Sequence, residues 1–217
     1  TSSGLIGVAV STGEDPMLFT LRADRTGHFL ERHAALSFDA PTERVARFKP
    51  KFVTRRLFAL QGGCALLVHT VGAPLEIHRV ERTGSSRKLT PKIIPVGPRN
   101  FLVPRRGGAW LVSGTLSNGP IEVHKLSGDD LEPDGPPHIL SGRPEDRPVG
   151  ACAVGEHVAI LIGGAAFSVV VTDGASSLRT EGTIGFDASN TREMGIAADP
   201  SGRAVWVALA KGSGVGL

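Results

Sequence analysis

The sequence predicts an all-β protein made from a repeated unit of about 46 residues. First, the segment 72–80 returns as the segment 119–126, with a Glu-x-His triplet in each copy. Second, short stretches rich in Val, Ile and Leu alternate with turns of Gly, Asn and Pro, which is typical of β-strands. Third, no window of 12 or more residues shows the sustained apolar spacing of an amphipathic helix.

The composition is that of a globular protein rich in turns. Of the 217 residues, 41% are hydrophobic and 21% are charged, which is too apolar for a disordered chain. The chain contains 28 Gly and 15 Pro residues, so turns are abundant. No run of 18 apolar residues is present, and the sequence therefore predicts no membrane span.

Each repeat contains about four short strands, which is the pattern of a β-propeller blade. A Val-rich or Leu-rich strand returns at spacings of about 45 to 48 residues, in the first two cases directly after a Gly-Gly pair. These strands are expected at residues 64–68, 109–112, 157–162 and 204–208. The predicted fold is a β-propeller or a propeller fragment with four-stranded blades.

The repeat divides the chain into three full blades and two partial ones, which together form one propeller domain. The expected divisions are a partial blade with a connector at 1–48, blades at 49–97, 98–142 and 143–190, and a partial blade at 191–217. Because an open blade edge leaves strand groups unpaired, we expect the chain to be part of a larger propeller, with a permuted small propeller as the alternative.

The segment 194–208, MGIAADPSGRAVWVA, resembles the repeats of YVTN, NHL and WD40-like propellers. In those repeats a strand runs into an Asp-Pro-x-Gly turn and then into a Val-rich strand. Pro200 sets φ for the turn, and Gly202 can adopt a positive φ. The resemblance implies propeller architecture and no particular activity.

Charge is distributed unevenly, and one basic segment stands out. Residues 1–108 hold 17 Lys and Arg against 8 Asp and Glu, whereas residues 109–217 hold 7 against 13. We expect the basic segment to be a surface connector that binds an acidic protein surface, with a solvated connector as the alternative. Nucleic acid is not expected, because no base-reading motif accompanies it. The proposed partner-binding residues are Arg44, Arg47, Lys49, Lys51, Arg55 and Arg56.

Two pairs of residues test the expected register. Cys64 and Cys152 fall in strands of different blades, so we expect two buried free thiols and a reducing, cytoplasmic compartment. Trp110 and Trp206 are expected in equivalent strands and largely buried.

The repeated Glu-His pairs are the most conspicuous polar feature. Glu76 with His78, and Glu122 with His124, share a strand face because alternate residues of a strand point the same way. Such pairs could bind a metal or move protons, but a polar surface ladder is the simpler interpretation. We assign no catalytic or metal-binding residue and expect no cofactor.

The sequence favours a non-catalytic scaffold, a platform for protein–protein interaction within a larger assembly. The inner-strand loops are poor in paired carboxylates and histidines, which argues against catalysis. The alternative is a propeller-type hydrolase, lyase or oxidoreductase with its site at the central channel.

Overall fold

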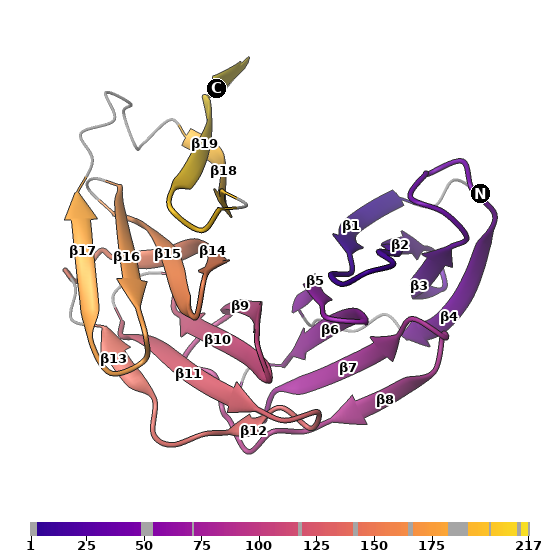
Figure 1. Cartoon of the computed structure of the whole chain (residues 1–217), viewed down its shortest axis with the longest axis horizontal. Coiled ribbons are helices and arrows are strands. Elements are labelled where there is room, and N and C mark those ends of the chain that lie inside the picture. Colours follow the sequence, from indigo (N-terminus) through magenta and orange to yellow (C-terminus); the bar gives the residue numbers. More distant parts are fainter. Residues whose placement is uncertain are drawn as a thin grey trace. The chain divides into compact units, whose positions relative to one another are not determined.

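A computed structural model shows a chain of antiparallel sheets, and the described part contains no helix (Figure 1). The all-β prediction is therefore confirmed. The structure describes residues 4–48, 54–70, 72–116, 119–140, 143–164, 167–181, 191–199, 201–211 and 214–216. These residues fall into two compact units, 1–94 and 95–217, which we describe separately.

The first unit contains two four-stranded sheets, each in the order of the sequence. The inner strands of the two sheets, β1 and β5, contact each other. The first sheet comprises β1 (Gly4–Val10), β2 (Leu18–Asp24), β3 (Gly27–His33) and β4 (Thr42–Phe48). The second comprises β5 (Thr54–Leu60), β6 (Gly63–His69), β7 (Glu76–Glu81) and β8 (Ser86–Leu89).

The second unit contains three sheets whose first strands, β9, β14 and β18, are neighbours in that order. The first sheet comprises β9 (Arg99–Arg105), β10 (Gly108–Gly114), β11 (Ile121–Ser127), β12 (Glu132–Pro133) and β13 (His138–Leu140). The next comprises β14 (Arg147–Val154), β15 (His157–Gly163), β16 (Ser168–Thr172) and β17 (Ser177–Glu181). The last comprises β18 (Thr191–Ala198), β19 (Val205–Lys211) and β20 (Gly214–Gly216).

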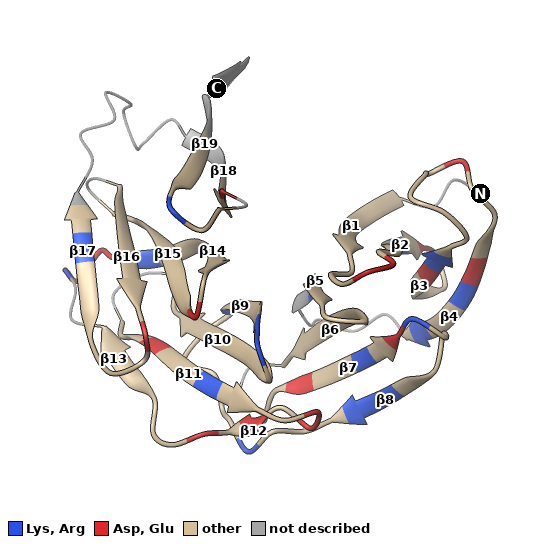
Figure 2. Ribbon diagram, viewed as in Figure 1, with Lys and Arg blue, Asp and Glu red and all other residues tan. Residues whose placement is uncertain are grey.

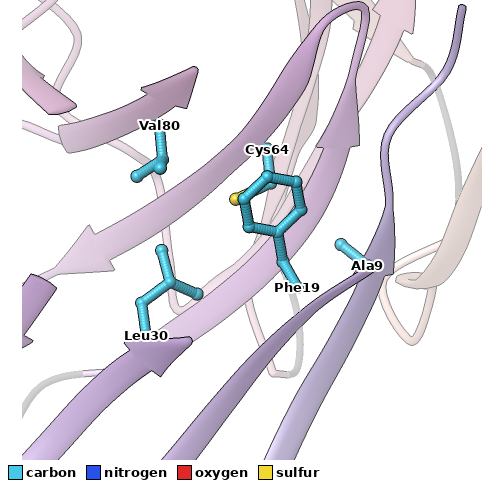
Figure 3. Packing of buried hydrophobic residues seen from close by; sticks show 5 residues of the cluster. All are labelled: Ala9, Phe19, Leu30, Cys64 and Val80. Carbon is cyan, nitrogen blue, oxygen red and sulfur yellow. The ribbon is translucent and has the colours of Figure 1, made fainter. Parts of the chain in front are cut away.

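Apolar side chains from both sheets of the first unit form a shared core (Figure 3). Phe19, Leu30, Cys64 and Val80 are fully buried, and Ala9 is nearly so. These residues come from β1, β2 and β3 of one sheet and from β6 and β7 of the next. Burial between successive sheets is the packing that holds propeller blades together.

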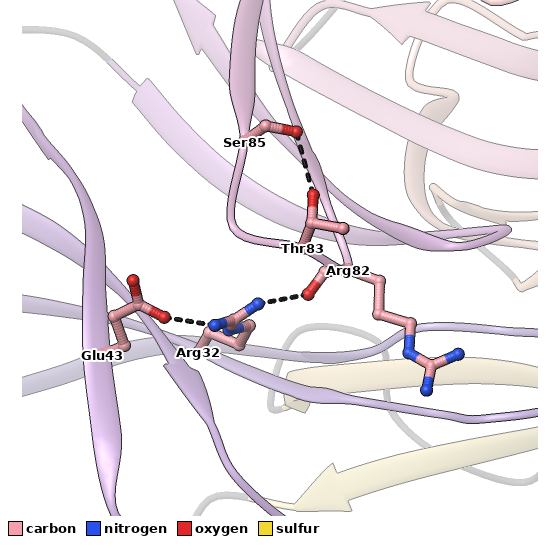
Figure 4. Close-up of polar contacts among 5 residues, drawn as sticks. All are labelled: Arg32, Glu43, Arg82, Thr83 and Ser85. Carbon is pink, nitrogen blue, oxygen red and sulfur yellow. Dashed lines mark hydrogen bonds and ion pairs between the residues drawn. The ribbon is translucent and has the colours of Figure 1, made fainter.

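A polar contact joins the same two sheets at their edge (Figure 4). The guanidinium of Arg32 on β3 donates one hydrogen bond to the carboxylate of Glu43 and another to the main-chain oxygen of Arg82. Beside it, the Thr83 and Ser85 hydroxyls lie 3.1 Å apart. Arg32 therefore bridges β4 and the β7–β8 turn.

The expected register of the tryptophans is wrong for one of them. Trp110 on β10 is 1% exposed, whereas Trp206 on β19 is 67% exposed. Both lie on the second strand of a sheet, but Trp110 is two residues beyond the pair that closes its hairpin and Trp206 only one. A shift of one residue turns a strand side chain to the opposite face of the sheet.

Both cysteines are free thiols, as expected, but only Cys64 is buried as predicted, whereas Cys152 is half-buried. Burial raises the pKa of both thiols, that of Cys152 to about 11. We therefore expect slow labelling of the folded protein at pH 8, with Cys152 reacting before Cys64. Ellman titration after unfolding without reductant should find two thiols per chain. A value near zero would contradict the structure.

Candidate functional site

A pocket of about 260 Å³ lies in the second unit, beside the residues that precede β14. It is lined by turn residues between β10 and β11, by the loop before β14, and by the end of β15. Pockets that hold small molecules combine apolar walls with a few placed polar groups. The lining residues are Gly119, Pro120, Ile121, Leu140, Arg143, Pro144, Asp146 and Ile162.

Asp146 is the buried charge in this lining, with 3% of the residue exposed. Its Oδ2 accepts a hydrogen bond of 2.7 Å from Nη1 of Arg179 on β17 and another of 2.9 Å from the main-chain N–H of Arg143. The loop and the outer strand of the same sheet therefore fix this carboxylate. Both bonds fall on one oxygen.

The other oxygen, Oδ1, accepts no hydrogen bond from the part of the chain that the structure describes. The main chain of Gly164 lies close to Oδ1, since a Cβ at Gly164 would be 3.0 Å from this oxygen. Burial alone would raise the pKa of Asp146, but the hydrogen bonds from Arg179 and Arg143 and their positive charges outweigh burial, so the pKa is lowered. The site thus presents a buried, ionised carboxylate with one oxygen that accepts no hydrogen bond from the described residues.

The basic segment does not form one described patch. Arg44 and Arg47 are exposed on β4, the outer strand of its sheet, where Glu43 also lies (Figure 2). Arg56 is half-buried on β5, the inner strand of the next sheet. Lys49 and Lys51 lie outside the described residues, as does the side chain of Arg55.

Aromatic rings connect this segment to other strands. The Arg44 guanidinium lies 3.9 Å from the ring centroid of Phe29, while Phe48 packs edge-on against the His78 ring at 4.9 Å. Residues 42–48, predicted to contain a connector, form a strand because they pair with β3. Binding of an acidic partner here remains a prediction.

The Glu-His pairs lie side by side within their strands, as predicted. The His124 Nε2 is 3.1 Å from Glu122, and the His78 Nε2 is 3.6 Å from Glu76, which also binds Lys88. Burial lowers the pKa of His124 and outweighs the opposing effect of Glu122. These pairs are polar contacts along third strands, and they do not line the pocket.

The described ranges lack two kinds of feature. They contain no group of three or more His, Cys, Asp or Glu side chains arranged to hold a metal ion. They also contain no helix long and apolar enough to cross a membrane.

Comparison with solved structures places this chain among propeller-type folds. A GH43 β-1,3-galactosidase shares 12% identity at a TM-score of 0.58, over 92% of this chain and 51% of its own. TolB from Acinetobacter baumannii shares 10% identity at a TM-score of 0.60, over 98% of this chain and 53% of its own. A sialidase from Trypanosoma rangeli, in complex with 2,3-difluorosialic acid, shares 10% identity at a TM-score of 0.54, over 95% of this chain and 42% of its own.

These likenesses establish the fold. The chain spans about half the length of the galactosidase and of TolB. No protein-family model matches the sequence, and no curated protein matches it. The propeller prediction is confirmed, whereas the finer resemblance to YVTN, NHL and WD40-like repeats is not shown by these structures.

The comparisons correct the interpretation of this chain as a non-catalytic scaffold. The galactosidase, the sialidase and a GH43_1 enzyme from Xanthomonas citri complexed with xylose carry the names of enzymes. The scaffold hypothesis depended on the small number of paired carboxylates in inner-strand loops. It overlooked Asp146, whose sequence signal is an acidic residue directly before an inner strand.

Proposed function

We propose that this chain belongs to a propeller-type enzyme that hydrolyses glycosidic bonds, with Asp146 as an ionised carboxylate of its site. The observation that carries the proposal is the buried Asp146 side chain, which lines the pocket, is held through one oxygen and has no hydrogen-bond partner among the described residues at the other. The names of the three similar enzymes support the choice of a glycoside as substrate.

The chemistry fits this carboxylate. Glycosidases pair an ionised carboxylate, which acts as base or nucleophile, with a protonated one that acts as acid. Arg179 and Arg143 keep the pKa of Asp146 low, so Asp146 suits the ionised role. Its Oδ1, which accepts no hydrogen bond from the described residues, is the atom that would accept a proton from water or attack the sugar.

The test is hydrolysis of a panel of aryl xylosides, galactosides and sialosides, which is measured through the release of the aryl group. We expect turnover of at least one substrate and a loss of at least about 100-fold in Asp146→Asn. This variant keeps the shape of the side chain and an acceptor for the Arg143 N–H. No turnover of any substrate, or full activity in a folded Asp146→Asn protein, would refute the proposal.

Glu156→Gln is the matched control. Glu156 is an exposed acid in the turn between β14 and β15, at the opposite end of β14 from Asp146. The variant removes the same charge from the same hairpin without touching the pocket. It should retain the activity of the parent.

A further inference from the structure

Trp206 presents an exposed aromatic ring on β19. The residue is 67% exposed, although it lies in the second strand of its sheet. Its neighbour Val207 is half-buried and packs against the cluster of Leu161 and Phe167 from the preceding sheet. Because successive side chains of a strand point to opposite faces, Trp206 points away from that cluster.

Small residues surround the indole on its face of the sheet. Ala197 lies directly opposite Trp206 across the β18–β19 pair, and Gly195 and Ala208 form the next pair on the same face. All three are exposed, and a Cβ at Gly195 would have no atom of the described residues within 4 Å. Residues that project no further than a Cβ leave room for a flat ligand beside the indole. We call these four residues the Trp206 shelf.

A fixed carboxylate lies in the turn next to this shelf. The main-chain N–H of Asp199 donates to the Ala204 oxygen at 2.9 Å, and its Oδ1 accepts a hydrogen bond of 2.7 Å from the Ser201 N–H. Hydrogen bonds from Ser201 and, to a smaller extent, from the Trp206 indole lower the pKa of Asp199. The turn therefore holds an ionised carboxylate beside the exposed ring.

The Trp206 shelf differs from the faces that successive sheets bury against each other. Between the first two sheets the buried side chains include Phe19 and Leu30, and between the last two Leu161 packs with Ile196. The shelf instead carries one large apolar side chain among alanine and glycine. Another sheet, or a second copy of the chain, would find little apolar area to bury on it.

We propose that the Trp206 shelf binds a neutral glycan chain. One face of a sugar ring consists of C–H groups and its rim carries hydroxyls, so a ring can lie on the indole while a hydroxyl donates to the Asp199 carboxylate. An ionised Asp199 disfavours an anionic sugar at the same place.

This shelf is a second site, apart from the proposed hydrolytic one. Trp206 is not among the described residues that line the pocket of Asp146. The inference rests on the proposed function only for the choice of a glycan as ligand, since binding here requires no bond cleavage.

The test uses the contrast between the two tryptophans, because Trp110 is 1% exposed and contributes a shielded background. The probes are xylohexaose and cellohexaose, with xylose and glucose as single-ring matches. We expect each hexasaccharide to protect Trp206 from acrylamide quenching and to bind at least about fivefold more tightly than its monosaccharide by calorimetry. No protection by either hexasaccharide would overturn the proposal. Tighter binding of an oligothymidylate than of both hexasaccharides would indicate a platform for nucleobases and also overturn it.

Variants separate stacking from a structural role. Trp206→Ala should weaken hexasaccharide binding at least about tenfold, whereas Trp206→Phe should keep part of the affinity because a smaller ring can still stack. Leu178→Ala is the control, since Leu178 on β17 is a large apolar residue of the same unit and is 70% exposed. The control should bind as the parent does, and all three variants should melt within about 2–4 °C of the parent. Parent-like binding in Trp206→Ala would refute the glycan site.

The remaining outcomes distinguish this proposal from the others. A dimer that forms with rising protein concentration and is lost in Trp206→Ala would assign the shelf to a contact between copies and overturn glycan binding. Glycan binding without hydrolysis of any aryl glycoside would remove the hydrolase and leave the shelf. Hydrolysis of aryl glycosides without hexasaccharide binding would remove the shelf and leave the hydrolase.

Discussion

Gly108→Ala is expected to destabilise the protein by about 2–4 kcal/mol. A Cβ at Gly108 would lie 2.0 Å from the main-chain oxygen of Leu126 and 3.0 Å from Cα of Ser127. Both contacts are backbone atoms of β11, which pairs with β10, so the added methyl group can fit only by separating two strands. Urea denaturation should show a lower midpoint with an unchanged slope.

Gly63→Ala should reproduce the effect in the first unit, since a Cβ there would lie 2.0 Å from the main-chain oxygen of Val80. Gly195→Ala is the control, because no atom of the described residues lies within 4 Å of its Cβ position. Equal stability of the Gly108 and Gly195 variants would show that the main chains of β10 and β11 do not lie as close together at Gly108 as the structure indicates.

These glycines show what the sequence could predict and what it could not. The repeated Gly-Gly pairs before apolar strands mark the repeat, and they place hairpin turns at Gly62 and Gly107, whose φ angles are +72° and +73°. The second glycine of each pair is needed for a different reason: its main chain lies close to the main chain of the third strand of the sheet. This reason depends on contacts between strands and is visible only in the folded chain.

The site was harder to predict than the fold for a similar reason. Strand periodicity and turn residues act locally, so the repeat is readable from the sequence. Asp146 acquires its properties from Arg179, which lies 33 residues further along the chain on the outer strand of the same sheet. Arg99 reaches the main-chain oxygen of Pro148 only because β9 and β14 are neighbours. Charge runs such as the basic segment are conspicuous in sequence, but its described arginines lie on the outer strand of one sheet and the inner strand of the next.

Arg179→Met is expected to cost about 2–4 kcal/mol at pH 7, because it leaves the carboxylate of Asp146 buried without its cation. The Asp146 side chain is 4% exposed and that of Arg179 is 24% exposed, so water cannot readily replace the lost partner. Arg82→Met removes an ion pair of the same 2.7 Å length, with Asp15, but those side chains are 52% and 64% exposed. This control should cost at most about 1 kcal/mol.

The pH dependence identifies the carboxylate as the cause of the Arg179→Met loss. In the parent, the lowered pKa of Asp146 contributes stability that is present above the unfolded pKa of about 3.9 and is lost as the pH falls through the folded value. In Arg179→Met, only the main-chain hydrogen bond and the charge of Arg143 still oppose the effect of burial, so we expect the pKa of Asp146 to rise and its ionised form to stabilise the fold less. The difference in unfolding free energy between parent and variant should therefore be largest near neutral pH and shrink below about pH 4.

Asp146→Asn in the Arg179→Met background should recover part of the loss at pH 7, since it removes the unpaired charge. Urea unfolding at pH 7 and pH 3.5 measures both effects, and a loss independent of pH would show that Arg179 stabilises the sheet by packing alone.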